Sequence, residues 1–166
     1  MQKSTHYYDS PIGSMEICTQ GNELISCVFL EDMKTGTFAA DPFGALVLSQ
    51  LDEYFKGTRK QFQVHLGDVG TLFDNLVWEE VGRVKFGYTA SYQDIANGIS
   101  APDSVRAVGA SNGRNPILLF VPCHRVIATD GSLRGYAGQV WRKKWLLEHE
   151  SRIEWGVTTL FDIEKT

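Results

Sequence analysis

The stretch Val121-Pro122-Cys123-His124-Arg125-Val126 organises the rest of this sequence. It follows an apolar run, residues 117–121, which is long enough to predict one buried strand. Proline has no N–H to donate to a sheet, so we expect that strand to end at Pro122. Cys123 and His124 then stand at the exit of the strand, where the backbone is free to aim a side chain.

Cys123 is the candidate nucleophile. A thiol reacts as its thiolate, and a neighbouring base or positive charge lowers its pKa. His124 is adjacent in sequence, and positive charges follow at Arg125, Arg142, Lys143 and Lys144. The alternative is a structural cysteine in the core with an incidental histidine beside it, because free cysteine is among the most buried residue types.

Length and composition limit the possible classes of protein. The 166 residues suffice for one domain or two small ones with a hydrophobic core. No run of ~18 apolar residues occurs, and the polar start MQKSTHYYDS lacks the apolar core of an export signal. Three cysteines, Cys18, Cys27 and Cys123, are too sparse and uneven a set for a disulfide framework. We therefore expect a cytoplasmic protein, in a reducing compartment that keeps Cys123 reactive.

Charge is unevenly distributed along the chain. The formal net charge is -4, yet residues 83–144 hold nine Lys or Arg against three Asp or Glu. A basic segment inside an acidic protein is typical of a local phosphate-binding face, with an ordinary solvated surface as the alternative. The modest total predicts moderate affinity for nucleic acid rather than a long footprint.

The first part of the chain, residues 1–66, predicts a small α/β domain. Short alternating segments separated by turns predict three strands, over residues 5–10, 15–19 and 24–30, and a further short strand over 61–66. Asp41-Pro42 predicts the start of a helix that ends at Gly57. Its expected apolar stripe is Leu46, Leu51, Tyr54 and Phe55. Cys18 and Cys27 are expected to fill the core, and no metal site is expected because no CxxC pair exists.

The second part, residues 67–166, predicts a mostly helical domain after a linker near residues 67–71. A helix over residues 72–82 has one apolar face, formed by Phe73, Val77, Trp78 and Val81. Ser91 is expected to cap a short helix, and Pro102 to begin a second helix that ends at Gly113. Two short helices joined by the Asn97-Gly98 turn suit a helix-turn-helix over about residues 91–113. The tail, with Trp155, Leu160 and Phe161, is expected to pack back on the protein.

Three blocks of sequence carry a resemblance to a known family. PCHRV, the preceding SVRAVGASNGRNP and the following GYAGQVWRKKWLLEHE resemble the O6-alkylguanine-DNA alkyltransferases, and the likeness extends from Phe73 to about Glu150. It implies a small N-terminal α/β domain with an antiparallel sheet, which supports a C-terminal domain containing the helix-turn-helix and the active-site cysteine. Leu72 and Asp74 stand where the family commonly has Pro and Gln, a departure expected to affect packing alone.

The resemblance implies how the helix-turn-helix meets DNA. In this family its second helix enters the minor groove, and an arginine matched by Arg106 fills the gap left by an extruded nucleotide. Tyr92 matches the residue that turns the nucleotide outward and lines its pocket. Without the resemblance, Arg106 would be an ordinary phosphate contact and Tyr92 a half-buried core residue. The other residues expected on the DNA-binding surface are Ala107, Ala110, Ser111 and Arg114.

The resemblance also implies the chemistry. The alkyl group moves in line from guanine O6 to the sulfur of Cys123, irreversibly and once per protein molecule, and no cofactor is involved. His124 matches the base that takes the thiol proton through a water, and Glu150 the carboxylate that orients it. Such a chain predicts a pKa of Cys123 well below the ~8.5 of a free thiol. Lys143 matches a lysine that stabilises the departing guanine, with a phosphate contact as its alternative.

The implied substrate pocket uses the backbone more than side chains. Tyr136, Ala137 and Gly138 match the loop that closes over the flipped base, and the carbonyl of Val121 is expected to read the guanine edge. Asn115 matches a residue that ties the turn between the second helix and the active-site strand, and it is expected to be structural.

These expectations converge on a monomeric DNA repair protein that acts on double-stranded DNA containing O6-alkylguanine, with O4-alkylthymine as a second candidate lesion. The main alternative is an alkyltransferase-like protein that binds lesions without repairing them. Such proteins replace the acceptor cysteine, which is present here as Cys123. A Cys-His hydrolase and a helix-turn-helix regulator are less economical, because no Gly-rich nucleophile turn and no sensor domain are evident.

Overall fold

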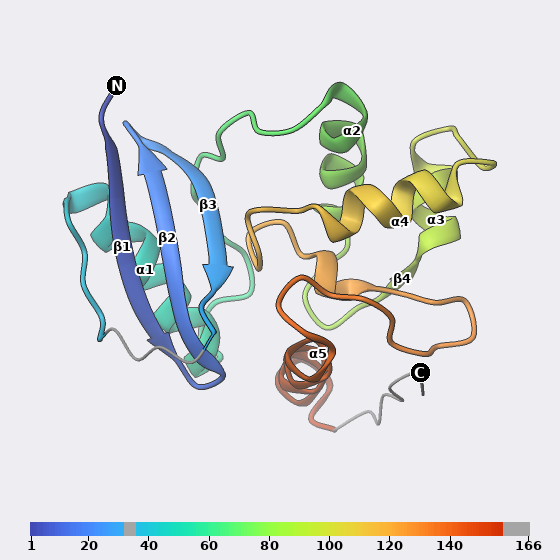
Figure 1. Ribbon diagram of the computed structural model, residues 1–166. Helices are drawn as coiled ribbons and strands as arrows, with labels where there is room; N and C mark the ends of the chain where they lie inside the picture. Colours follow the sequence, from blue (N-terminus) through green and yellow to red (C-terminus); the bar gives the residue numbers. More distant parts are fainter. Residues whose placement is uncertain (32–35, 158–166) are drawn as a thin grey trace. The chain divides into compact units, whose positions relative to one another are not determined.

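The computed structural model describes residues 1–31 and 36–157 (Figure 1). The chain divides into two compact units. The first comprises Met1–Val69 together with the short segment Pro116–Leu118, and the second comprises Gly70–Asn115 and Leu119–Thr166. The first unit therefore includes three residues from the segment just before the candidate nucleophile.

The first unit is built on a three-stranded antiparallel sheet. Strands β1 (Lys3–Ser10), β2 (Gly13–Gln20) and β3 (Glu23–Phe29) pair in chain order, which confirms the three predicted strands. Tight turns at residues 11–12 and 21–22 join them. Alternate side chains point to one buried face, among them Tyr8, Met15 and Ile17. An isolated parallel bridge joins Cys27 to Ile117, so the segment Pro116–Leu118 extends this unit beside β3.

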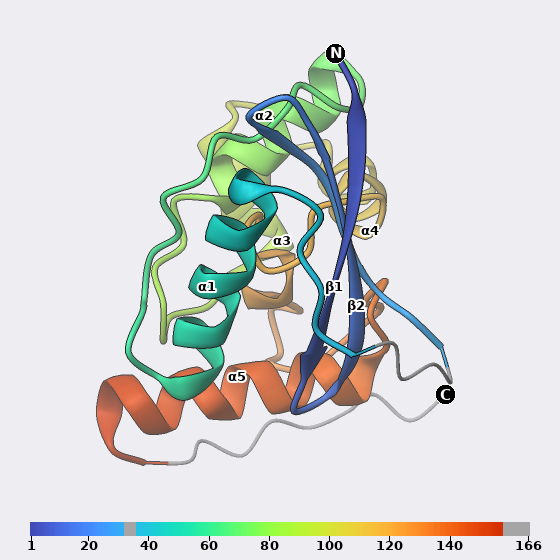
Figure 2. The ribbon, with the colours of Figure 1, turned by 90° about the vertical axis from the view of Figure 1, so that its left-hand side faces the viewer.

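Helix α1 (Pro42–Lys56) covers one face of the sheet (Figures 1 and 2). The Asp41 side chain accepts a hydrogen bond from the N–H of Gly44, and Gly57 ends the helix with a φ of 81°, as predicted. Leu51, Tyr54 and Phe55 are buried as expected. Leu46 is not, because the buried stripe runs through Val47 and Leu48 and leaves Leu46 47% exposed.

The predicted strand over residues 61–66 is wrong. Only an isolated parallel bridge between Leu24 and Leu66 remains of it. The Gln50 side chain satisfies the backbone of this segment instead: it accepts from the N–H of Gln63 at 2.8 Å and donates to its carbonyl at 3.1 Å. The Gln50 amide offers both a donor and an acceptor, so it takes the place that a neighbouring strand would have in a sheet.

His6 and Cys27 are core residues of the first unit. Both are fully buried, and His6 lies against the close approach of α1 at Gly44, where an added Cβ would meet its ring. The His6 ring accepts from the N–H of Ala40 and contacts Thr19 Oγ1 at 2.9 Å. No group of three or more His, Cys, Asp or Glu residues able to hold a metal occurs among the residues that the structure describes. None of the described helices is long and apolar enough to cross a membrane.

The second unit is mainly helical. Its helices are α2 (Leu72–Val81), α3 (Tyr92–Gly98), α4 (Val105–Gly113) and α5 (Val140–Trp155), and the short strands β4 (Ala90–Ser91) and β5 (Val126–Ile127) pair in parallel. Capping boxes begin two of the helices, with Thr71 and Asp74 at α2 and Ser91 and Asp94 at α3. Helices α3 and α4 pack together as the predicted helix-turn-helix pair.

The second helix of this pair begins at Val105, three residues later than predicted from Pro102. The carbonyl of Pro102 accepts a hydrogen bond from Gln93 on α3 at 3.0 Å, and the N–H of Ser104 closes a turn on Ala101 at 2.9 Å. These contacts hold residues 101–104 as a turn, so the helix starts only after Ser104.

The apolar run over residues 117–121 is buried as expected, but it is not a strand. All five side chains are at most 9% exposed. Leu119, however, has a φ of 72°, in the left-handed region that an L-residue with a large side chain rarely adopts. A strand cannot pass through such a residue, and the chain turns there before it reaches the cysteine.

The C-terminal tail is described as far as Val157. Trp155 lies at the end of α5 and its indole nitrogen donates to the carbonyl of Gly87 at 2.9 Å, which agrees with the expectation that the tail packs back. Leu160 and Phe161, which were included in that expectation, lie outside the described residues.

Candidate active site

Cys123 opens a single turn of 3-10 helix, Cys123–Arg125, directly after Pro122. The residue is 1% exposed. Asn115 donates one hydrogen bond to its Sγ atom at 3.2 Å and another to the carbonyl of Val121 at 2.9 Å. Asn112 donates to the carbonyl of Cys123 itself at 3.3 Å. Asn115, just beyond α4, therefore binds the sulfur itself, while Asn112 in the last turn of α4 holds the backbone of Cys123.

His124 and Glu150 form a buried pair. Nε2 of His124 lies 2.8 Å from Oε1 of Glu150, and both side chains are at most 1% exposed. Arg125 binds the same carboxylate through Nε at 3.0 Å and Nη2 at 2.9 Å, and its Nη1 donates to the carbonyl of Val84. A buried carboxylate needs such compensation, and a two-pronged guanidinium contact provides it.

Hydrogen bonding determines the proton positions in this pair. Although burial opposes it, the charge and hydrogen bonds of His124 and Arg125 hold the pKa of Glu150 well below its usual range. An ionised carboxylate only accepts, so Nε2 of His124 carries the hydrogen. Burial lowers the pKa of His124, against the opposing effect of Glu150, and the ring is therefore neutral at neutral pH. Its Nδ1 atom has no hydrogen-bond partner among the described residues and is available as a base.

The thiol does not have the low pKa that the sequence predicts. Burial raises the pKa of Cys123 to about 11, and it outweighs the lowering effects of the Asn115 hydrogen bond and the Lys143 charge. Removal of water from around a thiolate costs more free energy than these two interactions provide. At neutral pH the cysteine therefore rests as a thiol, and its proton has to leave during the reaction.

Lys143 is fully buried on α5. Its Nζ donates to the carbonyls of Val126 at 2.6 Å and Arg134 at 3.0 Å, and it lies 5.8 Å from the centre of the Tyr92 ring. Burial lowers its pKa to about 8, with Cys123 acting in the opposite direction. This burial is incompatible with the alternative of a phosphate contact, and it places the ammonium near the thiol and the pocket.

A pocket of about 490 Å³ lies beside these groups. It is lined by Tyr92, Val105, Gly109, Gly113, Arg134, Gly135, Tyr136 and Ala137. The Tyr136 ring faces that of His124 edge-on at 6.5 Å, and burial and the charge of Cys123 both raise the pKa of Tyr92. Tyr92, Tyr136 and Ala137 are thus brought together at one pocket, and Tyr92 and Tyr136 connect it to Cys123 and His124, which do not line it themselves.

Two groups predicted to contact the flipped base, the carbonyls of Val121 and Gly138, already accept hydrogen bonds within the protein. The carbonyl of Val121 accepts from Asn115 at 2.9 Å and from the N–H of Cys123 at 2.8 Å, so both its lone pairs are used. Gly138 is buried and its carbonyl accepts from Arg142 at 3.2 Å. Reading of a guanine edge by Val121 requires it to give up one of these bonds.

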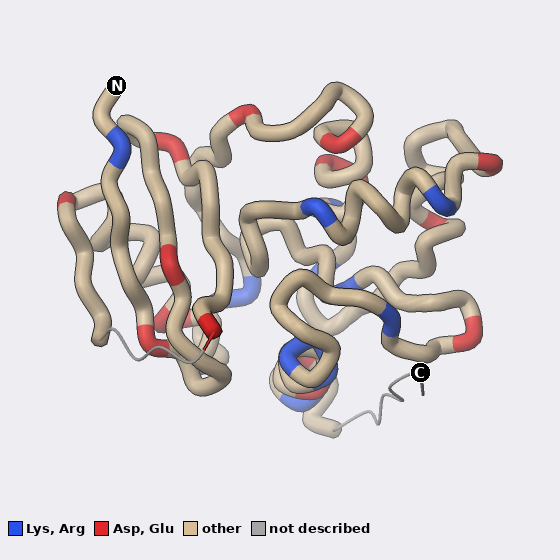
Figure 3. The backbone as a smooth tube through the Cα atoms, viewed as in Figure 1, with Lys and Arg blue, Asp and Glu red and all other residues tan. Residues whose placement is uncertain are grey.

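The outer face of α4 presents the residues expected to meet DNA, with one exception. Arg106, Ala107 and Ala110 are exposed, and basic positions lie near both ends of the helix (Figure 3). Ser111 is fully buried and donates to Asp74 at 2.6 Å, so its side chain is not on this surface. Its hydroxyl points into the helix packing because Val108 and Ser111 share the inner face.

Asp74 has a larger role than the packing effect expected of it. Its buried carboxylate accepts from Ser111 and, at 2.7 Å, from Arg114, which follows α4 and is half exposed. These bonds outweigh the effect of burial and hold the pKa of Asp74 well below its usual range. Trp78 on α2 donates to the carbonyl of Ser111 at 2.8 Å. Helix α2 thus anchors the C-terminal end of α4, where the bonds to Cys123 originate.

Reasoning from the sequence missed three residues of the site: Arg125, Asn112 and Asp74. The sequence identifies Arg125 only as a positive charge near Cys123. Nothing in the residues around it indicates that Arg125 binds a carboxylate 25 positions away. Asn112 lies at the end of α4 and Asn115 just beyond it, so the helical pattern of the sequence does not group the two amides.

A reactive cysteine with a histidine–carboxylate pair, held against a helix-turn-helix, defines a class of DNA-associated proteins with a cysteine-centred site. Two family models match the chain: the ribonuclease-like domain of 6-O-methylguanine DNA methyltransferase over residues 4–67, and its DNA binding domain over residues 72–152. The chain belongs to the 6-O-methylguanine DNA methyltransferase family.

Relatives and solved structures agree with this membership. The methylated-DNA–protein-cysteine methyltransferase of Mycobacterium bovis is 42% identical over 95% of this chain and 99% of its own length. The constitutive enzyme of that name from Bacillus subtilis is 36% identical over 90% of this chain and 98% of its own length. The crystal structure of Mycobacterium tuberculosis O6-methylguanine methyltransferase superposes with a TM-score of 0.82 at 39% identity, covering 90% of this chain and 93% of that one. Another structure shows the M. tuberculosis protein in complex with DNA, with a TM-score of 0.80 at 40% identity over 89% of this chain and 92% of that one.

Proposed function

We propose that this protein repairs O6-alkylguanine in double-stranded DNA by transferring the alkyl group to Sγ of its own Cys123. A sulfur–carbon bond forms as the bond between the alkyl carbon and guanine O6 breaks, and the thiol proton passes toward His124. The proton lost by the thiol is the one that the departing guanine gains, with His124 neutral before and after the transfer, so no charge accumulates. A thioether has no easy route back to a thiol, so each molecule acts once, without a cofactor.

The observation that carries this proposal is the buried hydrogen bond between His124 and Glu150, which leaves Nδ1 of the histidine next in sequence to Cys123 without a partner among the described residues. The 2.8 Å contact between His124 and Glu150 keeps Nδ1 of the ring free of hydrogen. We assign His124 the role of base, Glu150 that of its orienting partner and Asn115 that of a donor to the sulfur. Lys143 can donate a third N–H, beyond its two carbonyl contacts, toward the departing guanine.

The pocket suits a flipped base. An O6 atom inside the duplex stack is out of reach of a buried thiol, so the nucleotide has to leave the stack. We assign the pocket between Tyr92 and the residues 134–137 to the extruded guanine, with its volume of about 490 Å³. Gly138 supports this loop through its bond to Arg142.

The exposed face of α4 is assigned to DNA. Ala107 and Ala110 let the helix backbone approach a groove closely, and Arg106 is free in the solvent to enter the space left by the base. Arg114 is assigned to a phosphate, with Asp74 holding it in place at 2.7 Å. We further propose a monomer that works in the cytoplasm, where a reducing environment keeps the acceptor thiol free.

The test is incubation of the full chain with a duplex that contains one O6-methylguanine, followed by intact mass measurement. We expect the protein to gain the mass of one CH₂ unit per molecule and to stop after one equivalent. Binding to the lesion without any mass gain would indicate a lesion-binding protein instead. Removal of many lesions by unmodified protein would indicate a true turnover enzyme.

A further inference from the structure

The carboxylate of Glu150 has a third contact besides His124 and Arg125. The N–H of Gly87 donates to its Oε2 atom at 3.2 Å. Oε1 faces the histidine, and the bond from Gly87 to Oε2 acts together with the two-pronged contact of Arg125 to fix the rotation of the carboxylate about its terminal torsion. The orientation of Glu150 toward His124 therefore depends in part on where the Gly87 backbone is held, and in part on Arg125.

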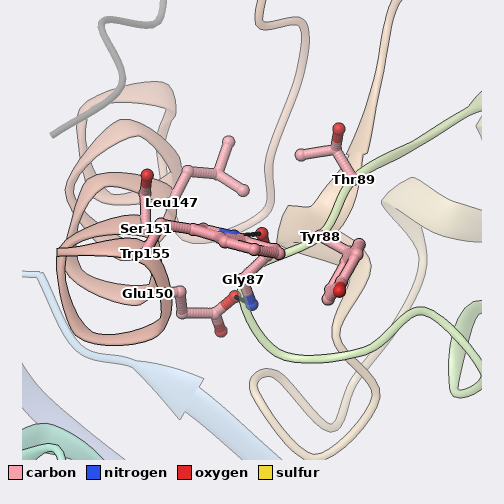
Figure 4. Close-up of a pocket in the computed structure, with 7 residues that line it drawn as sticks. All are labelled: Gly87, Tyr88, Thr89, Leu147, Glu150, Ser151 and Trp155. Carbon is pink, nitrogen blue, oxygen red and sulfur yellow. Dashed lines mark hydrogen bonds between the residues drawn. The ribbon is translucent and has the colours of Figure 1, made fainter. Parts of the chain in front are cut away.

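Gly87 is held by Trp155. Its carbonyl accepts a hydrogen bond from the indole nitrogen of Trp155 at 2.9 Å, and Figure 4 shows Gly87 between that indole and the Glu150 carboxylate. Gly87 has a φ of 80°, and an added Cβ would lie 2.6 Å from Cβ of Glu154. The backbone thus lies directly against the last turn of α5, in a conformation that only glycine adopts readily.

A pocket of about 190 Å³ lies on this side of Glu150 (Figure 4). Trp155 and Tyr88 form part of its wall, and their rings meet edge-on at 5.3 Å. Trp155 itself is 53% exposed, so its burial alone does not explain a tryptophan at the end of this helix. What its side chain does make is the hydrogen bond to the Gly87 carbonyl and part of the wall of the pocket that Glu150 also lines.

We propose that Trp155 is a positioning residue for alkyl transfer, which acts through the Gly87 backbone on Glu150 and, through Glu150, on His124. The inference rests on the proposed function of Cys123. Helix α5 then supplies both the carboxylate and, five residues later, the side chain that fixes the carboxylate's orientation. Loss of the indole N–H leaves Gly87 able to shift, so Glu150 loses one of the contacts that orient it toward the histidine, while those from Arg125 remain.

The test uses Trp155→Phe, which keeps an aromatic ring but removes the donor. Trp141→Phe is the matched control, because Trp141 lies on the same helix, is 47% exposed and donates to the side chain of Gln139 instead. The measurement is the single-turnover rate of reaction with O6-benzylguanine over a range of concentrations. We expect the limiting rate of Trp155→Phe to fall about 2- to 10-fold, as for the loss of one neutral hydrogen bond, with an unchanged half-saturating concentration.

A second comparison separates this role from general stability. In a Glu150→Gln background, where the oriented carboxylate is already lost, we expect Trp155→Phe to have little further effect on the limiting rate. Two outcomes overturn the proposal: a limiting rate equal to that of Trp141→Phe, or an undiminished effect in the Glu150→Gln background. If the proposed function itself were wrong, the result would differ from both, because the protein without any substitution would then not react with O6-benzylguanine.

Discussion

His124 and Glu150 are joined by a 2.8 Å hydrogen bond in which the ring can only donate, because the carboxylate is ionised. This bond leaves Nδ1 of a neutral histidine without a hydrogen, in the residue next in sequence to a cysteine that itself rests as a thiol. Before the reaction the site therefore contains neither a thiolate nor an imidazolium, and the proton of Cys123 has to leave as the alkyl group is transferred.

The first prediction concerns the pH dependence of the unmodified protein. The pKa of His124 is lowered from its usual 6.5, and that of Cys123 is about 11, so both groups stay neutral between these values. We expect a flat rate of reaction with O6-benzylguanine from neutral to mildly alkaline pH, and a fall on the acid side as His124 gains a proton. Thiolate absorbance in the ultraviolet at neutral pH would show that the thiol is already ionised.

The second prediction concerns the orienting carboxylate. Glu150→Gln should slow the reaction with O6-benzylguanine on the order of 100-fold at neutral pH, because the amide neither orients the ring nor strengthens it as a base. The loss should shrink toward pH 11, where hydroxide ionises Cys123 without His124. Glu148→Gln is the control, since Glu148 lies on the same helix and pairs with the ammonium of Lys144, at 3.9 Å, rather than with the histidine. Parallel profiles, separated by a constant factor at every pH, would mean that Glu150 does not govern the proton.

The third prediction concerns Arg106. Arg106→Ala should slow repair in duplex DNA far more than reaction with free O6-benzylguanine, because a free base needs no flipping, and the difference should reach a few kcal/mol at most (~2–3 kcal/mol). Arg83→Ala provides an exposed arginine of the same unit as a control. Equal slowing with both substrates would place the effect of Arg106 in the chemistry or the fold.

The fourth prediction concerns the anchor of α4. Asp74→Asn should lower the free energy of unfolding by about 1.5–3 kcal/mol, because the bonds of a buried carboxylate to Ser111 and Arg114 are charge-assisted. The folded-state pKa of Asp74 lies below 3.8, so its contribution is present above that pH and is lost as the pH falls toward the folded value. Denaturant titrations at neutral pH and at low pH should show the difference shrink in acid. Asp103→Asn, on the exposed turn before α4, should change the free energy little at either pH.

The sequence was sufficient to locate the site but not to describe its proton states. Cys123 and His124 are neighbours in the sequence, whereas Glu150 was identified only through the family resemblance of the block that ends there. The pKa of the thiol depends on how much water surrounds it, and that depends on packing contributed by segments far away. The same holds for the link between Asp74 and Arg114, which spans 40 positions, and for the carboxylate contact of Gly87, which spans 63.

Local backbone geometry was predictable only where a cap or turn has a chemical signature. Ser91 and Asp41 were found from their side chains, which accept the first free N–H groups of a helix. Leu119 gave no such signal, because its left-handed conformation is imposed by tertiary structure against the preference of the residue. The strand expected before the cysteine was therefore wrong, although its burial was right.

The measurement that tests the central claim most directly is the position of the transferred group. After reaction with a duplex containing O6-methylguanine, the protein is digested and each cysteine peptide is weighed. We predict one added CH₂ unit on the peptide with Cys123, none on those with Cys18 or Cys27, and none anywhere in Cys123→Ser, which should still bind the DNA. A methyl group on Cys18 or Cys27, or a Cys123→Ser protein that still removes the lesion, would contradict the assignment of Cys123 as the acceptor.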